Sequence, residues 1–191
     1  MRDPWTVLGT IDAIAPKYRG SERRDDGTTR LAREVSIVIE KDPMYGPRHD
    51  AERHRVGVEY ETILEEVLQS LDIPFESEND LRQRGTSRTP DILLSCPFAI
   101  NVGTETDERW KPVCWIDSKA LFGDVKTHKE SVIPQAESYV HRFGPGLLLY
   151  WFGHAPLQLL DDAQGDIAIC GWDLPDQILL PTGDFVNTSS S

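Results

Sequence analysis

The stretch PVCWIDSKA, residues 112–120, decides the fold expected for this chain of 191 residues. Its four consecutive apolar residues, VCWI, are typical of a central strand that is buried on both faces, and they lead directly into the polar DSK. A second stretch, TPDILL at residues 89–94, predicts a strand that opens with a proline, where the missing N–H costs no sheet hydrogen bond. If these two strands are neighbours, Asp91 and Asp117 converge at one end of the sheet.

Helices and further strands are expected around this pair. Apolar residues at spacings of three and four predict a helix over residues 48–71. A second helix is expected over residues 128–142, ended by the glycines of residues 144–146. Residues 147–152 and 166–172 are apolar enough for two more strands. The order helix, strand, strand, helix, strand, strand predicts an α/β fold with a mixed β-sheet flanked by helices.

The length predicts one main domain with extensions. We expect this domain over residues 46–181, after an N-terminal extension over residues 1–45 and before a flexible polar tail over residues 182–191. Within the extension, residues 17–29 are polar and charged, which is typical of a mobile loop. Residues 30–41 begin like a helix and continue with β-branched residues, so that both a helix and a strand stay open.

The composition bears on possible partners. With 32 acidic and 20 basic side chains the net charge is −12, which argues against non-specific coating of nucleic acid, because that binding depends on basic residues. An enzyme that binds phosphates through a local basic patch and a metal ion stays possible. Three scattered cysteines suit a reducing compartment. We find neither an apolar signal segment nor an apolar run long enough for a membrane span, so we expect no membrane association.

The two converging aspartates would need a compensating charge. At a separation of about 4 Å they repel each other by roughly 4 kcal/mol at an effective dielectric of about 20. A hard divalent cation such as Mg²⁺ or Mn²⁺ accepts oxygen ligands of this kind. Lys119 follows Asp117 by two residues and therefore leaves the strand on the same face, where it could orient or deprotonate a water. The alternative is an ordinary ion pair of Asp117 and Lys119 at the strand end, worth little at the surface.

An Asp followed by Asp-x-Lys on the next strand is the pattern of the PD-(D/E)xK phosphodiesterases, which use metal-assisted hydrolysis. In that fold the helix before the core hairpin often supplies a glutamate that orients the water on the metal. Glu61 is the first candidate for this role and Glu59 the second, with a solvated helix face as the alternative for both. Gln135, on the second predicted helix, could point into the site or be an ordinary exposed glutamine.

Further residues could contact the substrate. Arg82, Arg84 and Arg88 precede the first aspartate and form the best local phosphate-binding patch, with a solvated loop as the alternative. Asp124 and His128 follow the second strand and could hold a second metal or a phosphate. The alternative for these two residues is a turn aspartate and a histidine at a helix start.

Several segments resemble the TPD-motif nucleases, the relatives of the codanin-interacting nuclease. They are residues 88–91 (RTPD), 115–120 (WIDSKA), 122–124 (FGD) with His128, and 142–153 (RFGPGLLLYWFG), and the resemblance extends over residues 44–172. The family usually has Glu-Ser-Lys where this chain has Asp-Ser-Lys at residues 117–119.

The resemblance implies a restriction-endonuclease-like fold and a nuclease that acts in the nucleus or the cytoplasm, on DNA more than on RNA. It implies Mg²⁺ or Mn²⁺ at Asp91 and Asp117, with help from Glu61, and Lys119 as the catalytic lysine. The alternative is a non-catalytic adaptor that has the same fold and binds a codanin-like protein partner.

Overall fold

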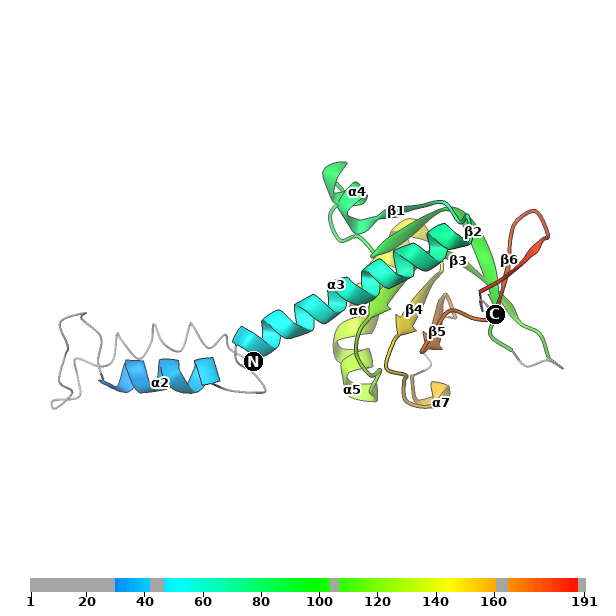
Figure 1. Cartoon of the computed structure of the whole chain (residues 1–191). Coiled ribbons are helices and arrows are strands. Elements are labelled where there is room, and N and C mark those ends of the chain that lie inside the picture. Colours follow the sequence, from blue (N-terminus) through cyan, green and yellow to red (C-terminus); the bar gives the residue numbers. More distant parts are fainter. Residues whose placement is uncertain (1–29, 42–46, 104–106, 161–164, 189–191) are drawn as a thin grey trace. The chain divides into compact units, whose positions relative to one another are not determined.

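The computed structural model describes residues 30–41, 47–103, 107–160 and 165–188 (Figure 1). The chain divides into two compact units, residues 1–55 and 56–191, with the boundary inside helix α3, Pro47–Ser70. The first unit contains helix α2, Arg30–Lys41. Residues 30–41, for which the sequence allowed either a helix or a strand, therefore form a helix. The mobile loop expected over residues 17–29 lies outside the described residues.

One mixed sheet of seven strands organises the second unit. The strand order is β5-β4-β3-β2-β6-β7, and β1 also pairs with β2. β2 and β3 are antiparallel, whereas β3, β4 and β5 run parallel to one another. The strands are β1 Phe75–Ser77, β2 Ile92–Asn101, β3 Trp110–Lys119, β4 Gly146–Tyr150, β5 Ile167–Gly171, β6 Gln177–Leu179 and β7 Phe185–Asn187.

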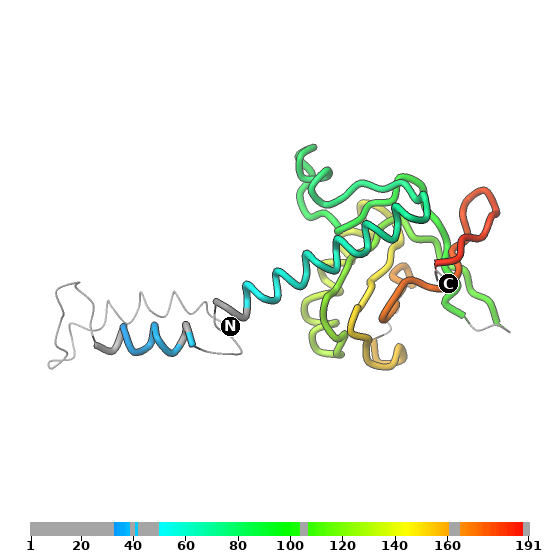
Figure 2. The backbone as a smooth tube through the Cα atoms, viewed as in Figure 1, coloured from blue at the N-terminus to red at the C-terminus, as the bar shows by residue number. Residues whose placement is uncertain are grey.

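Helices pack on both faces of this sheet, which confirms the predicted α/β class. On one face, Leu64 and Leu68 of α3 join a core cluster with Ile116 of β3. On the other face, Tyr139 of α6 packs with Trp115 of β3. Figure 2 traces the part of α3 that belongs to the second unit, residues 56–70, as a cyan segment along the sheet. The remaining helices are α4 Glu78–Gln83, α5 Val125–Thr127, a π-helical turn His128–Val132, α6 Ile133–Phe143 and α7 Leu157–Leu160. None of the helices in the described ranges has the length and apolarity to cross a membrane.

The β2–β3 pair contains a bulge that the sequence analysis did not predict. The register shifts between Leu93 and Phe98, so that residues 94–97 of β2 face only residue 114 of β3. As a result Val113 and Ile116 share one core cluster, although strict alternation would put them on opposite faces. Pro97, inside this irregular segment, is the sequence signal for it, because a proline interrupts the hydrogen bonds of a regular strand.

Two other parts differ from the expectation. Within the segment expected to be a flexible tail, β7 forms a hairpin with β6, around a turn in which Gly183 has a φ of +91°. Each strand has three residues, too few for a periodic pattern. The sequence analysis did not predict helix α4, which begins where Ser77 and Asp80 exchange hydrogen bonds in a capping box. The spacing Ser-x-x-Asp is the sequence signal for such a helix start.

Gly146→Ala tests the close packing of β4 against β3. A Cβ at this position would lie 2.1 Å from Cε2 of Trp115, whose buried indole donates a hydrogen bond to Gly144 O at 2.8 Å. Because neither side can yield, we expect the free energy of unfolding to fall by about 2–3 kcal/mol, measured by urea denaturation.

The matched control is Gly57→Ala inside α3. A Cβ there would meet only Glu61 Oε1, at 4.0 Å, so we expect a gain of up to about 1 kcal/mol from the better helix propensity of alanine. Equal effects of the two substitutions would contradict the packing argument.

Candidate active site

Asp91 is fixed directly before β2 by its backbone and by its side chain. Its carbonyl oxygen accepts a hydrogen bond from Glu78 N, at the start of α4, at 2.8 Å. Its carboxylate Oδ2 accepts a hydrogen bond from the backbone N–H of Ser118, in β3, at 2.6 Å. The preceding Thr89 and Pro90 are buried. The tripeptide Thr-Pro-Asp therefore anchors this carboxylate at the end of β3.

Asp117 and Lys119 form a buried ion pair at the same end of the sheet. Asp117 Oδ2 and Lys119 Nζ are 2.5 Å apart, and the two side chains are 1% and 15% exposed. Among the described residues, Asp117 Oδ2 is the buried side-chain oxygen that has no partner with hydrogen-bond geometry. The pair thus differs from the exposed surface pair that the sequence allowed as an alternative. Removing both charges from water is costly, and such a pair is weak evidence for a purely stabilising role.

The charges at this sheet end act on one another. Burial and the negative charge of Asp117 raise the pKa of Asp91 well above its ordinary value, and Glu61 adds to this rise. Burial by itself lowers the pKa of Lys119, but the carboxylates of Asp117 and Asp91 outweigh it, so that the pKa of Lys119 is raised. Lys119 therefore stays a cation in this arrangement, and the structure joins two aspartates, a lysine and Glu61 in one electrostatic cluster.

Two side chains of α6 extend this cluster. Lys119 Nζ donates a hydrogen bond to Gln135 Oε1 at 3.3 Å, and Gln135 Nε2 donates one to Tyr139 Oη at 2.7 Å. Gln135 thus points toward the lysine. Burial and the charge of Asp117 raise the pKa of Tyr139, which keeps the phenol protonated. The sequence analysis did not name Tyr139 as a site residue. Its spacing of four from Gln135 on one helix is the signal for this contact.

Arg142 is a positioning residue that sequence reasoning missed. Its Nη1 donates hydrogen bonds to the carbonyl oxygens of Ser87 and Arg88, the second at 3.0 Å. Arg88 has a φ of +51°, in the left-handed region that costs a non-glycine residue roughly 1–2 kcal/mol. The guanidinium at the end of α6 therefore holds the strained turn that leads into Asp91.

The predicted phosphate-binding arginines do not contact the carboxylate cluster. Arg82 pairs with Glu78 and Arg84 with Glu76, each at 2.7 Å, and both arginines are well exposed. Arg88 is also exposed. Exposed pairs of this kind contribute about 0–1 kcal/mol and can open when a phosphate competes for the guanidinium. Phosphate binding by these residues stays a prediction.

The structure corrects the expectation for His128. Its ring is fully buried, with Nδ1 2.7 Å from Tyr150 Oη and Nε2 3.1 Å from Leu160 O. Both nitrogens are engaged inside the protein, so His128 has a packing role instead of binding substrate. Asp124 caps helix α5, because its Oδ1 accepts the N–H groups two and three residues further on, at 3.0 Å each. Asp124 and His128 thus match the alternative stated for them, a turn aspartate and a histidine at a helix start.

The residues at the sheet end fit a hard divalent cation. Carboxylate oxygens are the ligands such an ion prefers, and the buried Oδ2 of Asp117 already lies 2.5 Å from a cationic group, the ammonium of Lys119. In the described ranges no three His, Cys, Asp or Glu side chains are grouped as a ready-made metal site. A cation here would therefore be held by two aspartates and by water, with Glu61 acting through water.

The fold and the site define a class: an α/β protein in which a buried Asp-x-Lys strand end meets the aspartate of a Thr-Pro-Asp tripeptide. The family model described as "Protein of unknown function TPD sequence-motif" matches residues 27–170. The chain belongs to this family, which confirms the resemblance found in the sequence.

Curated relatives carry the name CDAN1-interacting nuclease 1. The chain is 40% identical over 123 residues to that of Danio rerio, 38% to that of Homo sapiens and 33% to that of Gallus gallus. The match covers 64% of this chain and 38%, 41% and 38% of these relatives, so the chain spans about two fifths of their length. No solved structure matches the chain.

Asp91→Asn should stabilise the metal-free chain at neutral pH. Because the pKa of Asp91 is higher in the folded than in the unfolded state, its ionisation costs stability as pH rises above about 4. Asparagine keeps an oxygen for the Ser118 N–H and removes the charge. With a chelator present at pH 7, we expect the thermal midpoint to rise by at least about 2 °C. The difference should vanish toward pH 4.

Asp80→Asn is the matched control. The hydrogen bond from the Ser77 side chain lowers the pKa of Asp80, so ionised Asp80 contributes stability that is lost as pH falls. This variant should be less stable than the parent at pH 7. A destabilised Asp91→Asn at pH 7 would contradict the charge clustering described above.

Proposed function

We propose that this chain is a metal-dependent nuclease of the PD-(D/E)xK type that hydrolyses phosphodiester bonds, in DNA more than in RNA. The observation that carries the proposal is the buried Asp117–Lys119 pair beside Asp91. Charged groups that are buried together and shift one another's pKa are typical of catalytic sites. The name of the curated relatives, which contains the word nuclease, supports the same class. A nuclease of this kind would act in the nucleus or the cytoplasm.

Each side chain has a distinct role in this proposal. Asp91 and Asp117 would hold Mg²⁺ or Mn²⁺, with Glu61 contacting it through water. When bound, such an ion neutralises phosphate charge and lowers the pKa of a water. Lys119, as an ammonium, would donate a hydrogen bond to the attacking water or to a phosphate oxygen and hold it in line. Gln135 keeps this ammonium oriented. The backbone phosphates of the substrate would bind to Arg82, Arg84 and Arg88.

Asp91→Ala and Lys119→Ala should each abolish Mg²⁺- or Mn²⁺-dependent cleavage. We expect the rate to fall by at least about 100-fold, because groups that stabilise developing charge contribute about 10²–10³. The measurement follows labelled duplex DNA, single-stranded DNA and RNA in parallel, and circular dichroism checks that each variant folds.

Lys126→Ala is the control, since Lys126 is an exposed lysine of α5. It should cleave at the parent rate. If Asp91→Ala and Lys119→Ala also cleave at that rate, the nuclease assignment is wrong.

A second candidate is a non-catalytic adaptor that binds a codanin-like protein. The relatives' name, CDAN1-interacting nuclease 1, supports a protein partner for those proteins. The net charge of −12 also favours a protein partner over nucleic acid. In this case the ion pair of Asp117 and Lys119 would be the permanent state of the site.

Calorimetric titration with Mn²⁺ separates the two candidates. For the nuclease we expect Mn²⁺ to bind, and Asp117→Asn to weaken binding by at least about 10-fold, because the ion loses a charged ligand. The absence of binding, or equal binding by parent and variant, would favour the adaptor.

A further inference from the structure

Strand β5 forms the outer end of the sheet, and one of its sides is open. Gly146 N of β4 donates a hydrogen bond to Asp166 O at 3.0 Å, directly before β5. In a parallel pair, alternate residues direct both their N–H and their C=O toward the neighbouring strand. Asp166 faces β4 in this way, so the backbone groups of Ile167 and Ile169 point away from β4. No other strand in the described ranges pairs with this side of β5.

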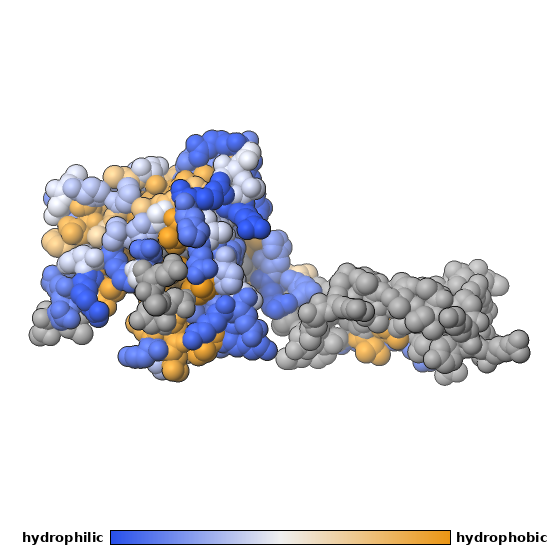
Figure 3. Space-filling model, turned by 180° about the vertical axis from the view of Figure 1, so that it is seen from behind, coloured by the Kyte–Doolittle hydropathy of each residue, from blue (hydrophilic) through white to orange (hydrophobic). Residues whose placement is uncertain are grey.

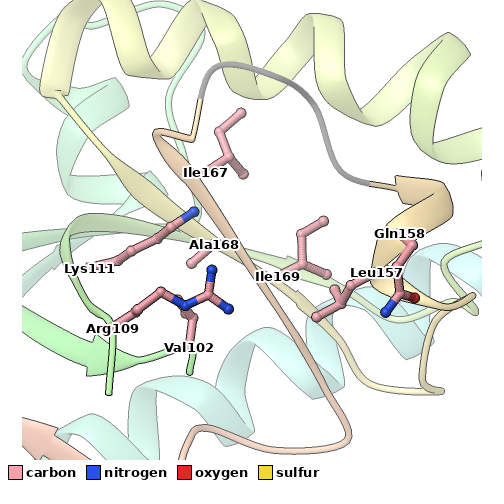
Figure 4. Close-up of a pocket in the computed structure, with 8 residues that line it drawn as sticks. All are labelled: Val102, Arg109, Lys111, Leu157, Gln158, Ile167, Ala168 and Ile169. Atoms are coloured by element: carbon pink, nitrogen blue, oxygen red, sulfur yellow. The ribbon is translucent and has the colours of Figure 1, made fainter. Parts of the chain in front are cut away.

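A groove follows the open side. A hollow of about 290 Å³ is lined by Ile167, Ala168 and Ile169 in succession, and Figure 4 shows the side chains around it. Because successive side chains of a strand point to opposite faces, a hollow that all three line lies along the strand edge. A second hollow of about 440 Å³ shares Val102 and Leu157 with the first and continues along Cys170 and Gly171. The second hollow is also lined by the carboxylates of Asp173 and Asp176. We therefore keep the name β5 groove for the first hollow alone, which Arg109 and Lys111 line.

The groove combines apolar walls with positive charge. Arg109 and Lys111 line the first hollow together with Gln158, and no described carboxylate lines it. Arg109 lies 3.8 Å from Asp107, but both side chains are well exposed, so this pair is weak. Leu157 is 44% exposed. Figure 3 shows apolar surface at the lower end of the folded unit, the end where Figure 1 draws α7.

An open edge of this kind is a template for another strand. Proteins usually blunt an exposed edge with lysine, proline or a bulge. The sequence of β5, IAICG, contains neither a lysine nor a proline that would prevent another strand from pairing with it. The edge therefore keeps the backbone groups of Ile167 and Ile169 available for pairing, beside two cations in a chain that is acidic overall.

We propose that the β5 groove binds an acidic, extended segment of a protein partner, which adds to the sheet as a further strand. The backbone groups of Ile167 and Ile169 would supply the hydrogen bonds. Alternate side chains of the segment would contact Leu157 or pair with Arg109 and Lys111. The proposal uses no residue of the candidate active site, so it stands or falls separately from the nuclease.

Fluorescence anisotropy of two labelled peptides tests the charge preference. The probes are Glu-Val-Glu-Val-Glu-Val-Glu and its counterpart with lysine in place of glutamate, each titrated with the full chain. We expect the glutamate peptide to bind at least 10-fold more tightly, although the net charge of −12 by itself favours the lysine peptide.

Charge reversal supplies the matched variants. Arg109→Glu combined with Lys111→Glu should invert the preference between the two peptides. Lys126→Glu, which reverses an exposed charge on α5, should leave it unchanged, and Asp91→Ala should bind the glutamate peptide at the parent affinity.

Strand addition is tested separately from charge. Ile169→Pro removes one backbone donor and should weaken binding at least 10-fold. Where this variant fails to fold by circular dichroism, a glutamate peptide with N-methyl groups on alternate residues replaces it. One of the two methylation registers should lose at least 10-fold in affinity, because it blocks the donors that face β5.

Several results would overturn the proposal. They are equal affinity for both peptides, an unchanged preference after charge reversal, and full affinity of both N-methylated peptides. A dimer that forms without peptide and is lost on charge reversal would assign the groove to a second copy of the chain. Displacement of the peptide by a thymidine oligonucleotide at comparable concentration would assign it to nucleic acid.

Discussion

The hydrogen bond from the backbone N–H of Ser118 to the carboxylate of Asp91 joins the two strands on which the candidate site depends. A main-chain donor cannot rotate away, so this bond sets Asp91 beside Asp117 whenever β2 and β3 are paired. Burial and the nearby charge of Asp117 raise the pKa of Asp91, and the two carboxylates together raise the pKa of Lys119. The ion pair of Asp117 and Lys119 is thus the internal compensation for two carboxylates that the fold forces together.

Two regions of the sheet carry side chains of opposite charge. At the end of β3, carboxylates are gathered and partly buried, which suits a cation. Beside β5, Arg109 and Lys111 face an open strand edge, which suits an acidic chain. The two proposals therefore assign different ligands to different parts of one sheet, and a single protein could use both without competition between the ligands.

Local patterns predicted the parts of the fold that are long and periodic. The apolar stripe predicted α3, and the run before Asp117 predicted β3, since burial of whole faces leaves a repeat in the sequence. The two-residue spacing also put Asp117 and Lys119 on one face. The β6–β7 hairpin was missed because three-residue strands are stabilised by pairing partners and not by periodicity.

Strand periodicity and a proline at a strand start were enough to predict that Asp91 stands at the start of one strand and Asp117 with Lys119 at the end of the next. Three features come from packing and could not be predicted: the depth at which these residues are buried, the contacts of His128 with Tyr150 and Leu160, and the hydrogen bonds from Arg142 to Ser87 and Arg88. The contacts of His128 and Arg142 join residues between 22 and 55 positions apart in the chain. No local pattern encodes contacts of that range, since they arise from the way that whole elements pack.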